Sequence, residues 1–196
     1  YMVTVSLVIG ALIGIPLGIL LVVTRKNGIW SNTILHQVLN PIINILRSIP
    51  FIILLIAIVP FTKLLVGTSI GTTAAIVPLT VYVAPYIARL VENSLLEVDD
   101  GIIEAAKAMG ASPLQIIRYF LLPEALGSLI LAITTAIIGL IGSTAMAGAV
   151  GGGGIGDLAL VYGYQRFDTI VIVITVIVLI IICLLYTSDA ADDSLR

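Results

Sequence analysis

The chain has 196 residues, of which 60% are hydrophobic and 10% are charged, and its mean hydropathy is +1.23. An ordinary soluble domain is roughly 45–50% apolar and about 25% charged, so this composition excludes a soluble globule and predicts an integral membrane protein. The net charge of −2 and the scattering of the nine Lys and Arg residues along the chain argue against a nucleic-acid partner.

Five long apolar runs predict an all-α membrane protein with about five transmembrane helices, because one span takes about 20 residues. We expect residues 1–185 to form one transmembrane domain with no large soluble part. The expected spans cover residues 3–23, 42–60, 74–87, 126–150 and 169–185.

Prolines interrupt two of these spans. Pro50 falls in the second span, and Pro78 and Pro85 fall in the third. Because each proline removes a helical hydrogen bond, we expect both helices to be kinked and to lie inside the bundle, where neighbouring helices support them.

Small residues recur at four-residue intervals in the first and fourth spans. Such stripes allow two helix backbones to approach closely. Two interpretations remain open, namely packing within the chain and a seam between two copies of it. The residues are Gly10, Gly14, Gly18, Ser143, Ala147 and Gly151.

Basic residues are distributed unevenly between the two sides of the predicted bundle. The positive-inside rule places the richer side in the cytoplasm, which predicts an external N-terminus and a cytoplasmic C-terminus. The poorer side holds Lys63 and Arg166, and the richer side holds Arg25, Lys26, Arg47, Arg89, Lys107 and Arg118.

The segment 89–125 is longer than two neighbouring spans need, so we expect a structured cytoplasmic loop with a function. Asp99 or Asp100 can cap a helix that begins near Gly101, and Gly110 suits the end of that helix.

A second short helix is predicted in the same loop. Ser112, Pro113 and Gln115 form a capping signature at its start. The helix is expected to run to Leu122 and to be broken by Pro123. The loop is therefore predicted to be an L-shaped pair of short helices.

The first helix of the loop has a smooth surface made by Ala105, Ala106 and Ala108, with Glu104 and Lys107 as its polar side chains. Such a helix can lie in a groove of another protein or rest on lipid head groups. The loop holds three basic and six acidic residues, and this acidity favours a protein partner.

The loop resembles the EAA loop of ABC importer permeases, whose pattern is Glu-Ala-Ala, three residues, Gly, nine residues and Ile-x-Leu-Pro. Phe120 stands where the pattern usually has Ile. Residues 44–55, 60–62, 67–71 and 75–80 are similar to the methionine importer permeases, and this resemblance extends to about residue 182. The matching loop residues are Glu104, Ala105, Ala106, Gly110, Leu122 and Pro123.

The resemblance implies a type I ABC importer permease fold in a bacterial inner membrane, and a transport subunit that is not itself an enzyme. The implied partners are two copies of an ATP-binding subunit, a substrate-binding lipoprotein and a second copy of this chain. The resemblance assigns docking on the ATP-binding subunit to Glu104, Ala105, Ala106 and Gly110, and support of the L shape to Leu122 and Pro123.

Nucleotide and metal sites are not predicted within the chain. The sequence lacks a GxxxxGK[ST] phosphate loop, so we expect ATP hydrolysis to occur on a separate chain. His36 and Cys183 have no companion ligands at metal-binding spacing, so neither a cofactor nor a metal is expected.

Two side chains within the spans allow a functional interpretation. Met146 lies between two alanines, and it is expected either to form part of a gate with its copy in a second protomer or to pack in the ordinary way. Arg47, near the start of the second span, either extends to the cytoplasmic interface or forms an internal ion pair or gate latch.

Residues 186–196 are polar and acidic without periodicity. They are expected to be a disordered tail, either native or a non-native addition.

The function predicted from all these features is that of an ABC importer permease for methionine. An importer permease for another amino acid or small organic solute is the nearest alternative, followed by a secondary carrier and a membrane scaffold. A secondary carrier would be favoured by buried acidic residues in the spans, and none occurs in spans three to five as predicted.

Overall fold

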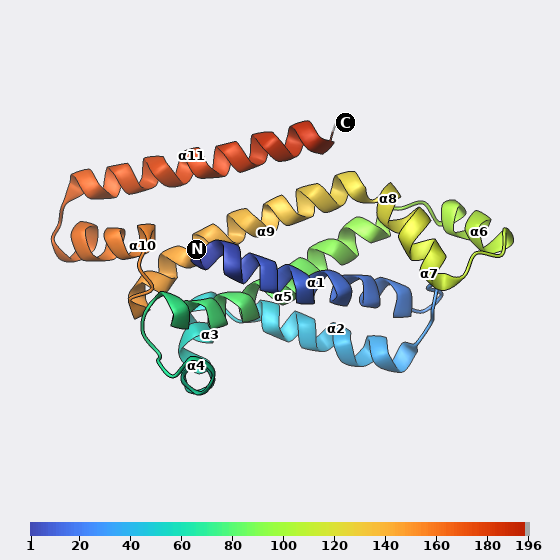
Figure 1. Ribbon diagram of the computed structural model, residues 1–196, viewed down its shortest axis with the longest axis horizontal. Coiled ribbons are helices and arrows are strands. Elements are labelled where there is room, and N and C mark those ends of the chain that lie inside the picture. The colour runs from blue at the N-terminus through green and yellow to red at the C-terminus, as the bar shows by residue number, and fades with distance from the viewer. Residues whose placement is uncertain (195–196) are drawn as a thin grey trace.

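The computed structural model describes residues 1–194, which are almost entirely helical and contain no strand. The long helices are packed together along the bundle (Figure 1), and α5 contacts both α1 and α9. The main elements are α1 (Met2–Thr24), α2 (Thr33–Ser48), α3 (Phe51–Ala57), α4 (Val59–Val66), α5 (Thr72–Leu96), α9 (Leu126–Ala147) and α11 (Thr169–Ser194).

Short elements occupy the two ends of this bundle. Figure 1 shows α6, α7 and α8 at the end away from the N-terminus, and α3, α4 and α10 at the opposite end. The short elements are α6 (Asp100–Ala108), α7 (Pro113–Ile116), a π-helical turn (Ile117–Leu121), α8 (Leu122–Glu124), a 3-10 turn (Gly148–Val150), α10 (Ile155–Leu158) and a second π-helical segment (Ala159–Gln165).

The number of spans agrees with the sequence. Four helices, α1, α5, α9 with the turn that follows it, and α11, are long and apolar enough to cross a membrane, and α2 with α3 forms a bent fifth candidate. The all-α class and the count of about five spans are therefore confirmed.

The second span differs from the single kinked helix expected over residues 42–60. The helix begins earlier, at Thr33, and α3 follows α2 after a bend of 102°. Ile49 is extended, with φ −80° and ψ 120°, because the residue before a proline avoids helical angles. Pro50 thus separates two helices instead of kinking one.

The third span is longer than expected. α5 continues past the predicted end at residue 87 and reaches Leu96, so Arg89 and Glu92 belong to this helix and not to the following loop. Pro78 and Pro85 are both buried, which confirms the prediction that this proline-bearing helix lies inside the bundle.

The last span is also longer than expected. α11 continues to Ser194, so residues 186–194 extend the helix where a disordered tail was predicted from residue 186. Neither glycine nor proline follows Thr169 in α11, so nothing in the backbone chemistry interrupts its hydrogen-bond ladder. Residues 195–196 of the predicted tail lie outside the described residues.

The glycine stripe of α1 packs against α5 of the same chain. A Cβ atom added to Gly14 would lie 2.5 Å from the carbonyl oxygen of Ala84, and one added to Gly18 would lie 2.6 Å from that of Ala88. These distances are too short for any side chain, so the glycines permit the close approach of the two backbones. The stripe in α1 therefore serves packing within the chain.

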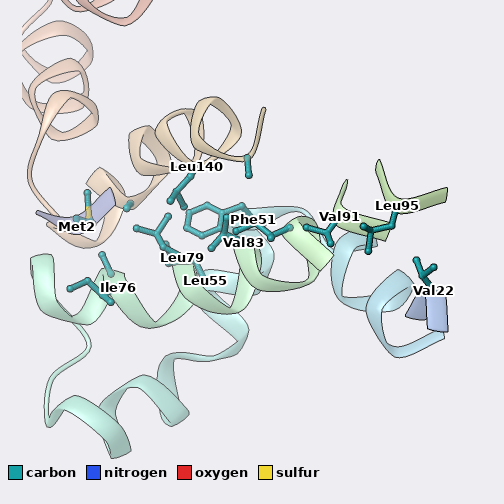
Figure 2. Packing of buried hydrophobic residues seen from close by; sticks show 14 of the residues in the cluster. Met2, Val22, Phe51, Leu55, Ile76, Leu79, Val83, Val91, Leu95 and Leu140 are labelled. Atoms are coloured by element: carbon teal, nitrogen blue, oxygen red, sulfur yellow. The ribbon is translucent and has the colours of Figure 1, made fainter. Parts of the chain in front are cut away.

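The stripe in α9 also points into the chain. Ser143 and Ala147 are buried among the other helices, whereas Gly151 lies beyond α9 in a turn with φ +66°. The remaining core is apolar, and in Figure 2 Phe51 lies among side chains of α5 and α9 that include Val83 and Leu140.

The seam between α1 and α5 predicts the effect of adding one methyl group. Gly14→Ala should lower the free energy of unfolding by about 1–3 kcal/mol, because the new Cβ atom overlaps backbone that cannot move away. Thermal unfolding of the purified protein in detergent measures the change.

Gly142→Ala in α9 is the matched control, since its added Cβ atom meets no atom of the chain within 4 Å. This variant should be neutral or slightly more stable because alanine favours helix over glycine. Equal unfolding temperatures for Gly14→Ala and the unaltered protein would contradict the packing described for the seam.

Candidate functional site

The first helix of the loop begins where the sequence predicts. The Asp99 carboxylate accepts a hydrogen bond of 2.7 Å from the Gly101 N–H, which caps α6. A carboxylate at this position satisfies a free amide and also interacts favourably with the positive end of the helix dipole.

The end of α6 explains why glycine stands at position 110. Gly110 has φ +80°, a left-handed conformation that costs a side-chain-bearing residue about 1–2 kcal/mol. The Gly110 N–H donates to the Lys107 carbonyl at 3.0 Å, and the Ala111 N–H donates to the Ala106 carbonyl at 3.1 Å. This pair of bonds is a Schellman motif, which turns the chain sharply after the helix.

The second helix of the loop is built from three pieces. The Gln115 side chain accepts from the Ser112 N–H at 2.8 Å, as the capping signature predicts. A π-helical turn follows α7 and leads into α8, and such wide turns accommodate local irregularity in a helix. Pro123 lies inside α8 and the break comes two residues later, at Ala125 with ψ 2°, so the predicted break at Pro123 is displaced.

Buried apolar side chains hold the L shape together. Ile116 in α7 is 1% exposed, and Leu121 at the end of the π-helical turn is 0% exposed. Sequence reasoning missed both residues, because their five-residue spacing fits a π-helical turn and not the period of a regular helix. Leu122 is partly buried against the same core, whereas Pro123 is exposed.

The four predicted docking residues do not share one surface. Glu104, Ala105 and Gly110 are exposed, but Ala106 is 0% exposed. Ala106 therefore packs inside the loop and cannot contact a partner, which corrects the role expected for it. Its methyl group is small enough to let α6 lie close to the rest of the loop.

An open cavity of about 470 Å³ separates α6 from the adjoining ends of α1 and α5. Charges of both signs line it, and among the described residues none of them forms an ion pair. Glu104 therefore lies beside basic groups as well as on an open surface. The charged lining residues are Arg25, Lys26, Asp100, Glu104 and Lys107.

A buried polar network joins α2 to α5 just before the loop. Arg89 donates from Nη1 to the Glu92 carboxylate at 2.6 Å, and from Nη2 to the side-chain oxygens of Asn40 and Asn44 at 2.6 Å each. The Glu92 residue is only 5% exposed. Sequence reasoning missed the network because it assigned Arg89 and Glu92 to the loop.

Two predicted positions remain, Met146 and Arg47. Within one described chain, Met146 forms no gate and Arg47 forms no ion pair. Met146 is 49% exposed in the last turn of α9. The Arg47 guanidinium lies over the ring of Tyr86, 5.8 Å from its centroid, with no carboxylate partner among the described residues. Within those residues, no group of three or more His, Cys, Asp and Glu side chains could hold a metal ion.

Comparison with known proteins identifies the family. The model of the family described as "Binding-protein-dependent transport system inner membrane component" matches residues 14–192. The chain belongs to this family. Its membrane-spanning helices and its loop with the Glu-Ala-Ala pattern are thus those of an inner membrane component of a transport system.

Individual relatives are similar over most of this inner membrane component. The probable D-methionine transport system permease protein MetI of Vibrio cholerae is 51% identical over 175 residues, which cover 89% of this chain and 78% of the relative. The protein with the same description from Pasteurella multocida is 51% identical over 181 residues, which cover 89% of this chain and 83% of the relative.

Solved structures show the same fold. A chain of the MetNI methionine ABC transporter, solved in inward-facing conformations, superposes with a TM-score of 0.95 at 50% identity and covers 98% of this chain and 89% of that chain. A chain of an amino acid ABC transporter solved with histidines has a TM-score of 0.80 at 18% identity, covers 100% of this chain and 88% of that chain, and supports the fold alone.

The buried network predicts a coupling between two charges. Arg89→Gln should lower the free energy of unfolding by about 3–5 kcal/mol, because it leaves the Glu92 carboxylate buried without a cation. The double variant Arg89→Gln, Glu92→Gln should recover part of that loss. Thermal unfolding of the unaltered protein, both single variants and the double variant measures the coupling.

Arg118→Gln is the control, since this arginine is exposed on the loop and its loss should change stability by no more than about 0.5 kcal/mol. Strictly additive effects of the two substitutions at positions 89 and 92 would contradict the ion pair.

Proposed function

We propose that this chain is the permease subunit of an ATP-driven ABC importer for methionine, and that it forms the translocation pathway. The family membership and the close similarity to methionine permeases over nearly the whole chain carry the proposal. The loop with the Glu-Ala-Ala pattern supports it, because its two capped helices project from the bundle as a rigid unit that another protein can move. An importer permease for another amino acid remains the nearest alternative.

In this proposal α6 is the coupling helix, which docks on an ATP-binding subunit. Glu104, Ala105 and Gly110 are exposed and form the docking surface. Ala106 positions α6 from inside the loop, and Leu122 and Pro123 support the second helix. Two copies of the ATP-binding subunit would engage two copies of this chain.

The side that carries α6 is assigned to the cytoplasm. α1 starts at the opposite end of the bundle and α11 runs back toward α6 (Figure 1), which gives an external N-terminus and a cytoplasmic C-terminus. Arg47 and Arg89 lie within helices, so they are no longer counted among the basic residues of the loops. Four basic loop residues then remain at the α6 end, Arg25, Lys26, Lys107 and Arg118, against Lys63 and Arg166 at the other end, so the positive-inside rule still supports this orientation.

Transport follows from linkage between the two subunits. ATP binding closes the partner subunits, which moves both coupling helices and tilts the attached bundles between inward and outward access. An external substrate-binding lipoprotein delivers the cargo, and the pathway lies between the two copies. This chain supplies the pathway and the mechanical link, while the partner hydrolyses ATP.

A secondary carrier is the candidate from another class. The longer α5 contains Glu92, a buried acid of the kind that proton-coupled carriers use. The Glu92 carboxylate is paired with Arg89, which also donates to the two asparagines on α2. This pairing within the chain favours a structural role and the ATP-driven importer.

The coupling proposal predicts the effect of reversing one charge. Glu104→Lys should reduce ATP-driven methionine uptake at least about tenfold while membrane insertion stays intact, because the change removes a charge-assisted contact from the docking surface. Uptake into proteoliposomes that contain the complete transporter measures it.

Glu124→Lys, an exposed acid on α8 of the same loop, is the matched control and should transport normally. Full uptake by Glu104→Lys would count against α6 as the coupling helix.

We also propose that Met146 from each of two copies forms part of the gate. A flexible thioether can close a narrow pore between small residues and then move aside. Met146→Ala should let substrate leak across the membrane without ATP and raise the ATP consumed per molecule transported.

Leu131→Ala is the control, because Leu131 lies on the same helix and is 46% exposed, close to the 49% of Met146. If Met146→Ala shows no substrate leak and consumes the same amount of ATP per molecule transported as the unaltered protein, Met146 is not part of the gate.

A further inference from the structure

Arg47 lies in the last turn of α2, far from the end of the bundle at which that helix starts. The Asn32 N–H donates to the Thr24 carbonyl at 3.0 Å, so α2 starts level with the end of α1. Arg47 is fourteen residues beyond Thr33, which places it about 21 Å along α2 at 1.5 Å per residue. A side chain at that distance is well inside a hydrocarbon layer about 30 Å thick.

The contacts of α5 independently indicate the same depth of Arg47 in the bundle. Gly14, one residue from the middle of α1, packs against Ala84 and Ile87. Tyr86 lies between these two residues in α5, and the Arg47 guanidinium lies over its ring. Arg47 is therefore near the middle of the bundle, too deep for its side chain to reach the interface easily. This corrects the position expected for it near the cytoplasmic start of a span.

The chain contains no carboxylate that could neutralise Arg47 at this depth. Glu92 is the first acidic residue in the sequence, and it is buried with Arg89. α9 and residues 169–187 of α11 contain neither Asp nor Glu. A second copy brings the same set of residues, so it adds no free acid either. The guanidinium must therefore be hydrated by water or paired with a ligand.

An arginine in this position is costly if it faces lipid. Arg47 is exposed in the single chain, but the guanidinium lies against Tyr86 instead of extending away from the bundle. The contact draws it toward the aromatic face of α5. Any water or ligand that solvates the guanidinium must therefore lie on this face of α5.

Aromatic rings continue from Arg47 along α5. Tyr86 stacks on Tyr82 with ring centroids 6.2 Å apart, and Phe51 meets Tyr82 edge-on at 5.4 Å. On α9, a Cβ atom added to Gly139 would lie 3.3 Å from the Tyr86 ring, and one added to Gly142 would meet nothing within 4 Å. Gly139 thus lets the Tyr86 ring lie close to α9, and Gly142 faces open space.

We propose that Arg47 binds the carboxylate of the transported α-amino acid, and that Tyr86 and Tyr82 receive its apolar side chain. The inference rests on the proposed function and deepens it. A guanidinium matches a carboxylate with two parallel hydrogen bonds, a thioether makes favourable contacts with aromatic rings, and an ammonium group is attracted to the face of a ring. The strip from Arg47 to Tyr82 therefore suits an amino acid with an apolar or thioether side chain.

Uptake of methionine by the complete transporter in proteoliposomes tests the proposal. Arg47→Gln should lower ATP-driven uptake at least about tenfold, since a hydrogen bond to a charged group is lost. Arg47→Lys keeps the charge and should retain an intermediate rate. Arg166→Gln is the matched control, because Arg166 also lies over a tyrosine ring, that of Tyr162, but outside the long spans.

The outcomes separate the two proposals. Unchanged uptake by Arg47→Gln alongside ATP-driven uptake by the unaltered transporter would overturn the role of Arg47 and leave the proposed function standing. An unaltered transporter that does not carry methionine would reject the proposed function together with this assignment.

Labelling of a single cysteine gives a second measurement that does not depend on transport. In a Cys183→Ser background, Arg47→Cys should react with a water-soluble thiol reagent, and methionine should slow that reaction. Leu12→Cys, near the middle of α1 and 71% exposed, should not react because it faces lipid. An unreactive Arg47→Cys, or a reaction that methionine leaves unchanged, would overturn the proposal.

Discussion

The close contact between α1 and α5 is the constraint on which the other features depend. Three glycines bring the two backbones together and fix α5 inside the bundle. α5 then contacts α2 through Arg89, meets Phe51 of α3 through Tyr82, and continues toward α6 at its end. Because a packed interior transmits displacement and deforms little, we expect a movement of α6 to reach several helices through this one element.

Two arginines in the membrane-crossing region differ in how their charge is compensated. The two terminal nitrogens of Arg89 donate to an acid on its own helix and to two amides on α2, so Arg89 joins two helices. Arg47 has an aromatic ring beside it and no acid among the described residues. An unpaired charge in a bilayer must face water or a ligand. Arg89 is paired and therefore has a structural role, whereas Arg47 is unpaired and is placed beside the pathway.

Local signals in the sequence predicted the loop well, because helix caps depend on neighbouring residues. Asp99, Gly110 and Gln115 each act as the sequence indicates. The bend at Pro50 and the burial of Ala106 were not predictable in this way, since hydropathy gives neither a bend angle nor the inner side of a short helix. The roles of Arg47 and Arg89 depend on which helices lie opposite them, which one sequence does not specify.

The proposed transport mechanism depends on α6 being the surface that a separate ATP-binding subunit moves. Thiol labelling of Ala105→Cys and Ala106→Cys, with and without that subunit, tests this most directly, because the first position is exposed and the second is 0% exposed. We expect the subunit to protect Ala105→Cys from the reagent, while Ala106→Cys reacts slowly in both states. Equal labelling of Ala105→Cys in the free and assembled states would contradict it.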